Sequence, residues 1–183
     1  MLWQARRGII SGRGAIEPAG GTWQTVFSLA LTSDATGQSG INLRPGILAA
    51  ALSGPDGNLV RVTVKAASVD GMTIDRIYMG NVGASAPDFS GNQVQMFSGG
   101  NASFTVGAGA SLLLDPVSFS FNHTLNLLFA CHFSGTSSVG ILNSANETTY
   151  FKVTSDESSL TTTSGYSIIA SQMRVVSKVE VFA

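Results

Sequence analysis

Residues 23–31 read Trp23-Gln24-Thr25-Val26-Phe27-Ser28-Leu29-Ala30-Leu31, with large apolar side chains at Trp23, Phe27, Leu29 and Leu31. These four positions share one face of a strand, because successive side chains of a strand point to opposite faces. Helical periodicity is almost absent from the chain, since Gly, Ser and Thr interrupt nearly every window. The stretch predicts a β-strand with one buried face and an all-β fold.

Further short β-rich runs follow at intervals of about 8–12 residues. The runs are Leu59–Val64, Ile74–Met79, Val94–Phe97, Ala102–Val106, Ser111–Leu114, Val117–Phe121, Leu125–Phe133, Val139–Asn143, Thr149–Thr154, Tyr166–Ser171 and Arg174–Phe182. Turn residues separate them, such as Asp70-Gly71 and Gly99-Gly100. This pattern predicts an antiparallel sandwich or barrel, formed by one domain over residues 22–183.

Residues 1–21 differ from the rest of the chain. Arg6, Arg7 and Arg13 precede every acidic residue, and glycines interrupt the few apolar residues around them. We interpret this segment as an extended N-terminal arm in which Trp3 and the three arginines dock on a partner subunit. An edge strand or a frayed tail is the alternative interpretation.

The composition restricts the possible partners. Charged residues make up 11% of the chain, against roughly 25% in an average soluble protein. The formal net charge is -1, so no global field steers the protein to nucleic acid or to an anionic membrane. No apolar run approaches the ~18 residues of a transmembrane helix. We expect a surface of Ser, Thr, Asn and Gly, or one covered by other subunits.

The N-terminus lacks the pattern of a secretory signal. Arg6 and Arg7 are followed by only two isoleucines before Ser11-Gly12 ends the apolar run, whereas a signal needs about 7–15 apolar residues. A surface-type β protein made in the cytoplasm without a signal suggests release by lysis, as for a virion component. An ordinary cytoplasmic β domain, or a chain whose signal has been removed, remains open.

The chain offers few groups for catalysis. Cys131 and His132 are adjacent in the predicted strand Leu125–Phe133, so they point to opposite faces and cannot pair. We expect Cys131 to be a buried structural residue and His123 to be a solvated turn residue. Asp56 and Asn58 could offer oxygens to calcium, but no dense acidic loop surrounds them. The chain is therefore predicted to be no enzyme and to hold no metal or cofactor.

One loop suits a sugar. Phe89 stands next to Asp88 in Ala86-Pro87-Asp88-Phe89-Ser90-Gly91, and a loop aromatic beside a carboxylate can contact glycan. The predicted glycan-binding residues are Asp88 and Phe89. In the alternative interpretation, Phe89 plugs the end of the sandwich.

The order of several short motifs between Asn58 and Gly135 resembles a known domain. These motifs are Leu59-Val-Arg-Val-Thr-Val64, Met72-Thr-Ile-Asp-Arg-Ile77, Val94-Gln-Met-Phe-Ser-Gly-Gly100, Ala102-Ser-Phe-Thr-Val106, Gly107-Ala-Gly-Ala-Ser111, Asp115-Pro-Val-Ser-Phe119 and Leu125-Asn-Leu-Leu-Phe129. Together they resemble the jelly-roll accessory domain that precedes the catalytic domain of bacterial secreted SGNH (GDSL-type) hydrolases. The resemblance covers under half the chain, and the Gly-Asp-Ser-Leu nucleophile block is absent. It implies a jelly-roll sandwich with glycan affinity and does not imply an esterase.

Jelly-roll modules of this kind resemble those that bacteriophages and gene transfer agents carry as head spikes, fibres, decoration proteins or tail-tip proteins. We therefore expect a non-enzymatic virion protein that is present in many symmetric copies. Its arm would dock on other capsid or tail proteins, and its sandwich would face host-surface glycan. A free carbohydrate-binding module of a bacterial glycan-degrading system is the competing hypothesis.

Overall fold

The computed structural model describes residues 20–183, which form fifteen strands and one short 3-10 turn, η1 (Ala49–Ala51). The strands are β1 (Trp23–Ser28), β2 (Ser33–Ala35), β3 (Ile41–Ile47), β4 (Gly57–Lys65), β5 (Met72–Asn81), β6 (Val94–Met96), β7 (Phe104–Val106), β8 (Ser111–Leu113), β9 (Val117–Phe121), β10 (Leu127–Ser134), β11 (Val139–Asn143), β12 (Glu147–Val153), β13 (Ser167–Ile169), β14 (Gln172–Arg174) and β15 (Val176–Phe182). Every strand pair is antiparallel. The predicted all-β antiparallel class is confirmed. In this part of the chain, no helix is long and apolar enough to cross a membrane.

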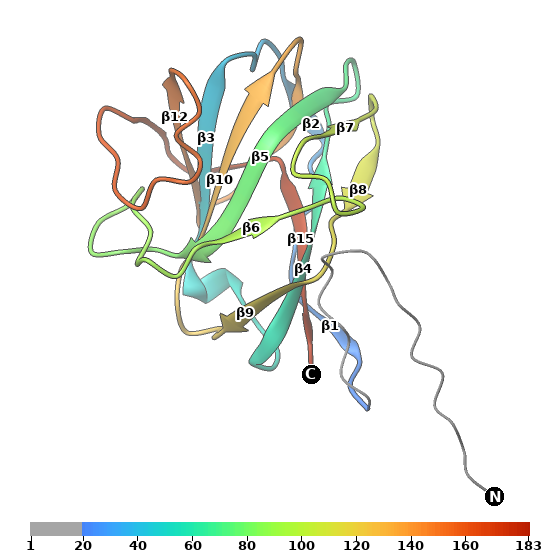
Figure 1. Cartoon of the computed structure of the whole chain (residues 1–183), viewed down its shortest axis with the longest axis vertical. Helices are drawn as coiled ribbons and strands as arrows, with labels where there is room; N and C mark the ends of the chain where they lie inside the picture. The colour runs from blue at the N-terminus through green and yellow to red at the C-terminus, as the bar shows by residue number, and fades with distance from the viewer. Residues whose placement is uncertain (1–19) are drawn as a thin grey trace, which may run out of the picture.

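Two large sheets form the sandwich (Figure 1). One has the order β1-β15-β4, and both β8 and β9 pair with β4. The other has the order β13-β12-β3-β10-β5, and both β6 and β7 pair with β5. A smaller sheet of β14, β11 and β2 completes the domain. The jelly-roll order of connections stays a prediction.

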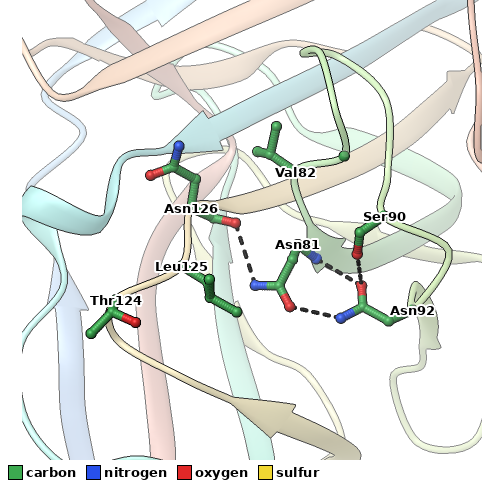
Figure 2. Close-up of a pocket in the computed structure, with 8 residues that line it drawn as sticks. Asn81, Val82, Ser90, Asn92, Thr124, Leu125 and Asn126 are labelled. Atoms are coloured by element: carbon green, nitrogen blue, oxygen red, sulfur yellow. Dashed lines mark hydrogen bonds between the residues drawn. The ribbon is translucent and has the colours of Figure 1, made fainter.

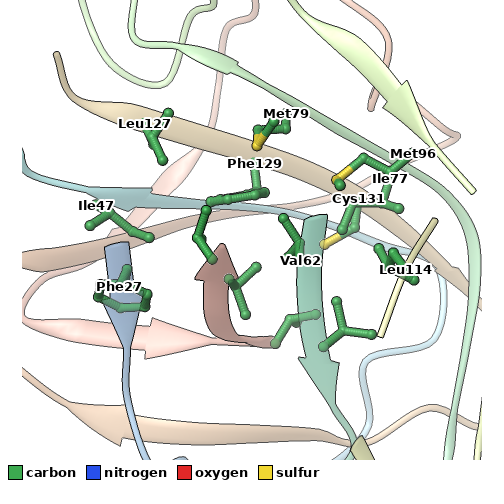
Figure 3. Close-up of a cluster of buried hydrophobic side chains, with 14 of the residues drawn as sticks. Phe27, Ile47, Val62, Ile77, Met79, Met96, Leu114, Leu127, Phe129 and Cys131 are labelled. Carbon is green, nitrogen blue, oxygen red and sulfur yellow. The ribbon is translucent and has the colours of Figure 1, made fainter. Parts of the chain in front are cut away.

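Side chains from both large sheets meet in one hydrophobic core (Figure 3). Sheet β1-β15-β4 contributes valines such as Val62 and Val179, and the other sheet contributes Ile77, Met79 and Phe129. Burying an aliphatic or aromatic side chain of this size contributes about 1.5–3 kcal/mol. The interface between the sheets is therefore the main source of stability.

The opening alternation of β1 is interrupted by a bulge. Val26 and Phe27 are both buried, because the register against β15 shifts between Thr25 and Phe27. A bulge places an extra residue in one strand and changes which face the following side chains occupy. β1 also ends at Ser28 instead of reaching Leu31 as predicted.

The sequence pattern missed β3, although β3 lies in the middle of a sheet between β10 and β12. Pro45 explains the omission, because proline lacks an N–H and is rare in central strands. The ladder between β3 and β12 continues through Pro45, which lies opposite Thr149. On the other side, pairing with β10 runs through Gly46 and resumes at Leu43. The strand thus accommodates proline by omitting one stretch of pairing.

β10 begins two residues later than predicted. Leu125 precedes it in a turn and is 46% exposed, so its predicted place on the apolar face is wrong. Cys131 is buried on that face with Phe129 and Phe133, as predicted. The pKa of its thiol is raised, chiefly by burial, which keeps the sulfur protonated and unreactive.

The described N-terminal entry and the C-terminus lie together at one end of the sandwich. Thr22 and Ala183 exchange two backbone hydrogen bonds of 2.8 and 3.1 Å. Gly57 packs so closely there that a Cβ would lie 2.7 Å from the carbonyl oxygen of Phe182. The neighbouring carboxylate of Asp56 accepts hydrogen bonds at the His123 turn, which places that turn at the same end.

Candidate functional site

The four residues predicted to dock on a partner lie outside the described part of the chain. Trp3, Arg6, Arg7 and Arg13 all precede residue 20, where the description begins. The two residues predicted to contact glycan, Asp88 and Phe89, lie in the loop that follows β5, between residues 82 and 93.

Phe89 faces inward. Its side chain is only 3% exposed and packs against Leu128 and Ala130 of β10, on the side of the sheet that faces away from the main core. At Gly80 of β5, a Cβ would lie 2.8 Å from the Phe89 ring, so glycine makes room for the ring there. Phe89 therefore plugs the outer face of the seven-stranded sheet, and in this structure its ring is not presented to solvent for stacking on a sugar.

Asp88 joins two loops. Its carboxylate accepts hydrogen bonds from the backbone N–H of Thr163, at 2.7 Å, and from the Thr163 hydroxyl, at 3.2 Å. The backbone N–H of Phe89 donates to the carbonyl of Thr161 at 2.8 Å. These bonds attach the loop of residues 82–93 to the loop of residues 154–166, which lies beside it over the sheet.

Both loops are held by Arg44, whose side chain is fully buried. Its guanidinium donates to the carbonyls of Pro87 at 2.7 Å, Glu157 at 3.0 Å and Leu160 at 2.6 Å. It also lies 5.0 Å from the ring centroid of Phe89 and 5.6 Å from that of Tyr166. We call these six residues the Arg44 clamp (Arg44, Pro87, Phe89, Glu157, Leu160 and Tyr166).

Burial changes the electrostatics of the Arg44 clamp. It lowers the pKa of the Arg44 guanidinium, which nonetheless stays charged because arginine begins from a very high pKa. Burial also raises the pKa of Tyr166 to about 12, against the opposing effect of the Arg44 charge. The clamp thus contains a permanent cation and a neutral phenol near physiological pH, and we assign it a structural role.

A hollow lies beside the clamp, at the end of the sandwich. It is an open cleft of about 420 Å³ between the loop of residues 82–92 and the turn before β10. We call it the amide cleft, and it is lined by Asn81, Val82, Gly83, Ser90, Asn92, Thr124, Leu125 and Asn126. None of these eight side chains is ionisable.

A hydrogen-bond network fixes the amides of the cleft (Figure 2). Asn92 Nδ2 donates to Asn81 Oδ1 at 2.7 Å, and Asn81 Nδ2 donates to the carbonyl of Asn126 at 3.4 Å. Asn92 Oδ1 accepts from the backbone N–H of Asn81 and from the Ser90 hydroxyl, both at 2.9 Å. Both the nitrogen and the oxygen of the Asn81 side chain thus take part in the network, and at 6% exposure this side chain forms the floor of the cleft.

The turn on the other side of the cleft is equally well defined. Asn122 Oδ1 accepts from the backbone N–H and the hydroxyl of Thr124, at 2.8 and 2.7 Å. Asn126 Oδ1 accepts from the backbone N–H of Ala49 at 2.8 Å. The two walls are thus held in place before any ligand arrives, which reduces the entropy cost of binding.

The structure buries Phe89 and ties Asp88 to Thr163, while polar residues of the same loop line the amide cleft. Ser90 and Asn92 line the cleft, directly after the predicted pair Asp88 and Phe89. Asn81 and Asn126 come from separate strand ends, and no spacing in the sequence connects them. Within this loop the polar residues Ser90 and Asn92 face the cleft, whereas the aromatic residue is buried.

The two histidines considered for catalysis each pair with an aspartate. His132 Nδ1 lies 2.7 Å from Asp75 Oδ2, and the Ser134 hydroxyl donates to the other oxygen of Asp75 at 2.5 Å. Since Ser134 donates to the carboxylate, this arrangement is not the serine–histidine contact that activates a nucleophile. His123 pairs with Asp56, with Nδ1 to Oδ1 at 2.8 Å. Its side chain is also exposed, as expected of a turn residue.

The acidic residues that the structure describes are not clustered with other metal-binding side chains. Within residues 20–183, no group of three or more His, Cys, Asp or Glu side chains is placed to hold an ion. At the turn considered for calcium, Asp56 Oδ1 instead accepts from the backbone N–H of His123 at 2.9 Å.

Comparison with known proteins adds no family assignment. No protein-family model matches the chain, and no curated protein matches its sequence. Functional inference therefore rests on the geometry above and on the composition of the chain.

Proposed function

We propose that this chain is a non-enzymatic structural protein of a bacteriophage or phage-like particle. It serves as a head decoration, spike or fibre, or as a tail component, and it is made in the host cytoplasm. The arginine-containing arm docks on other virion proteins, and the sandwich contacts glycan on the host surface. The low charge content and the Gly-, Ser- and Thr-rich composition support this role, because repeated parts of a particle cover much of each other's surface.

The amide cleft is the single observation that carries the glycan part of the proposal. A neutral sugar offers hydroxyl groups that both donate and accept hydrogen bonds, together with small apolar C–H faces. The cleft matches both, with amide and hydroxyl groups beside the aliphatic side chains of Val82 and Leu125. We therefore replace Asp88 and Phe89 by the cleft residues as the proposed glycan contacts.

The position of the cleft constrains how the protein attaches. The cleft turn Thr124–Asn126 follows directly on His123, which Asp56 holds at the end where Thr22 and Ala183 meet. A partner pressed against Thr22 would therefore lie close to the cleft.

A free carbohydrate-binding module is the second candidate, and the same cleft supports it. The two functions differ in what the arm does. In a virion protein the arm is required for incorporation, whereas in a free module it has no such partner. Many symmetric copies are expected only in the first case.

The test compares the full chain with a variant that lacks residues 1–20. Each is expressed during particle assembly, scored for incorporation into purified particles, and passed as free protein over immobilised host polysaccharide. We expect the deletion to abolish incorporation and to leave polysaccharide retention unchanged. Retention of both proteins without incorporation of either would favour the free module, and absence of both activities in the full chain would refute the proposal.

A further inference from the structure

The free hydrogen-bond donors and acceptors of the amide cleft define which groups a ligand must supply. This inference rests on the proposed glycan function. Asn126 Oδ1 is fixed as the oxygen because the backbone N–H of Ala49 donates to it. Both N–H bonds of Asn126 Nδ2 therefore lack a partner among residues 20–183. Asn92 Oδ1 is fixed in the same way by the backbone N–H of Asn81, and Nδ2 of Asn92 keeps one N–H available after donating to Asn81.

The two hydroxyl groups of the cleft are acceptors, in contrast to the amide donors. Ser90 donates its only hydrogen to Asn92 Oδ1, and Thr124 donates its only hydrogen to Asn122 Oδ1. Neither amide oxygen can donate in return, so both hydroxyl groups are left as acceptors. Each wall of the cleft consequently presents one amide donor and one hydroxyl acceptor, Asn92 with Ser90 and Asn126 with Thr124.

A planar secondary amide suits this arrangement better than a plain hydroxyl group. In the trans form its carbonyl and its N–H point in opposite directions, so it can accept from one wall while it donates to the other. An acetamido group adds a methyl group, for which Leu125 and Val82 offer aliphatic contacts. The absence of ionisable side chains among the eight lining residues disfavours an acidic sugar, which would lose water without gaining a cation.

We propose that the amide cleft binds an N-acetylated sugar unit within a neutral glycan. The acetamido group is the recognised feature, and the sugar hydroxyl groups make the remaining contacts at the open side of the cleft. The lining contains no aromatic ring, so affinity for one unit is weak and retention depends on several copies of the protein acting together.

The test uses two tetrasaccharides with the same β-1,4 linkage, one of N-acetylglucosamine and one of glucose, titrated into the full chain by calorimetry or ligand-observed NMR. We expect the N-acetylglucosamine tetramer to bind at least ten-fold more tightly. Asn126→Asp keeps the oxygen that accepts from Ala49 and removes both free N–H donors, so it should weaken this binding at least ten-fold. Asn101→Asp adds the same charge at an exposed turn outside the cleft and should bind like the unchanged protein.

Each other outcome overturns a defined part of the reasoning. Equal binding of both tetramers, with loss of both in Asn126→Asp, would refute the acetamido preference and keep the cleft as a glycan site. Binding that Asn126→Asp leaves unchanged would remove the cleft from the assignment. If neither tetramer binds, the inference is wrong; retention on host polysaccharide would then still support the proposed function, and loss of that retention would refute both. Thermal unfolding of each variant checks that the domain is intact.

Discussion

The Arg44 clamp and the amide cleft lie on neighbouring faces and share the loop of residues 82–93. The polar groups of the clamp are buried and paired, whereas those of the cleft are exposed and keep free donors. In the clamp, three backbone carbonyls and two aromatic rings surround a buried cation. In the cleft, the exposed amides of Asn126 and Asn92 keep free N–H donors, although hydrogen bonds with Ala49 and Asn81 fix their orientation. One loop can therefore be anchored by some of its residues and offer others for binding. The two regions differ in whether solvent or a ligand can reach their hydrogen-bond donors.

The largest expected effect tests the clamp itself. Arg44→Met removes the donor from three carbonyls, and each buried carbonyl left unpaired costs about 1–3 kcal/mol. We expect unfolding in denaturant to show a loss of about 4 kcal/mol or more. Arg76→Met is the matched control, because the Arg76 side chain is 54% exposed where it pairs with Asp156, and a pair with an exposed arginine should be worth less than about 1 kcal/mol. Equal losses in the two variants would show that Arg44 is not an anchor.

The next effect separates the two roles within one loop. Phe89→Ala should cost about 3 kcal/mol, because it leaves a cavity beneath the loop. Ser90→Ala, one residue away, should change stability by no more than about 1 kcal/mol but weaken retention on glycan. Denaturant unfolding and glycan retention of the folded fraction measure the two effects. If Phe89→Ala leaves stability unchanged and abolishes retention, Phe89 is a glycan contact after all.

The smallest effect concerns the turn that carries the cleft. The hydrogen bonds from the backbone and ring of His123 lower the pKa of Asp56 below its ordinary 3.8. A carboxyl group with a lowered folded-state pKa contributes stability above the unfolded pKa and loses it as the pH falls through the folded value. Asp56→Asn should therefore be less stable than the unchanged protein near neutral pH, and the difference should shrink below pH 3.8.

Denaturant midpoints of the two proteins, measured across the acidic range, give the readout for Asp56. A difference that is constant with pH would show that the Asp56 carboxylate is not linked to folding. Because Thr124 and Asn126 follow His123 in the same turn, glycan retention by the unchanged protein should decline over the same acidic interval.

The sequence predicted most strands because alternation is a local property. Runs such as Val117–Phe121 show buried and exposed side chains in strict turn, and their neighbours in sequence suffice to predict them. β3 was missed because its Arg44-Pro45-Gly46 segment contradicts every local rule for a strand. Only pairing with β10 and β12 makes that segment extended.

The candidate site was less predictable for a related reason. The pairing of β5 with β10 brings Asn81 to Asn126, and a hydrogen bond to Asn81 holds Asn92 beside them. The spacing of these residues in the sequence gives no sign that they meet. The sequence identifies Phe89 as an aromatic residue in a loop. Whether its side chain is buried depends on which other loop covers that face of the sheet. The covering loop supplies Thr161, which is distant in sequence and bonds the Phe89 backbone.

The sequence by itself determined the all-β class, the short antiparallel strands, the buried cysteine and the scarcity of charge. Each follows from composition or from period-two alternation, which act between near neighbours. Only the tertiary structure decided that an arginine lies at the centre of a sheet face, that Phe89 turns inward, and that asparagines from separate strand ends share one cleft. These features depend on hydrogen bonds and contacts between distant segments, and the folded chain alone brings such segments together.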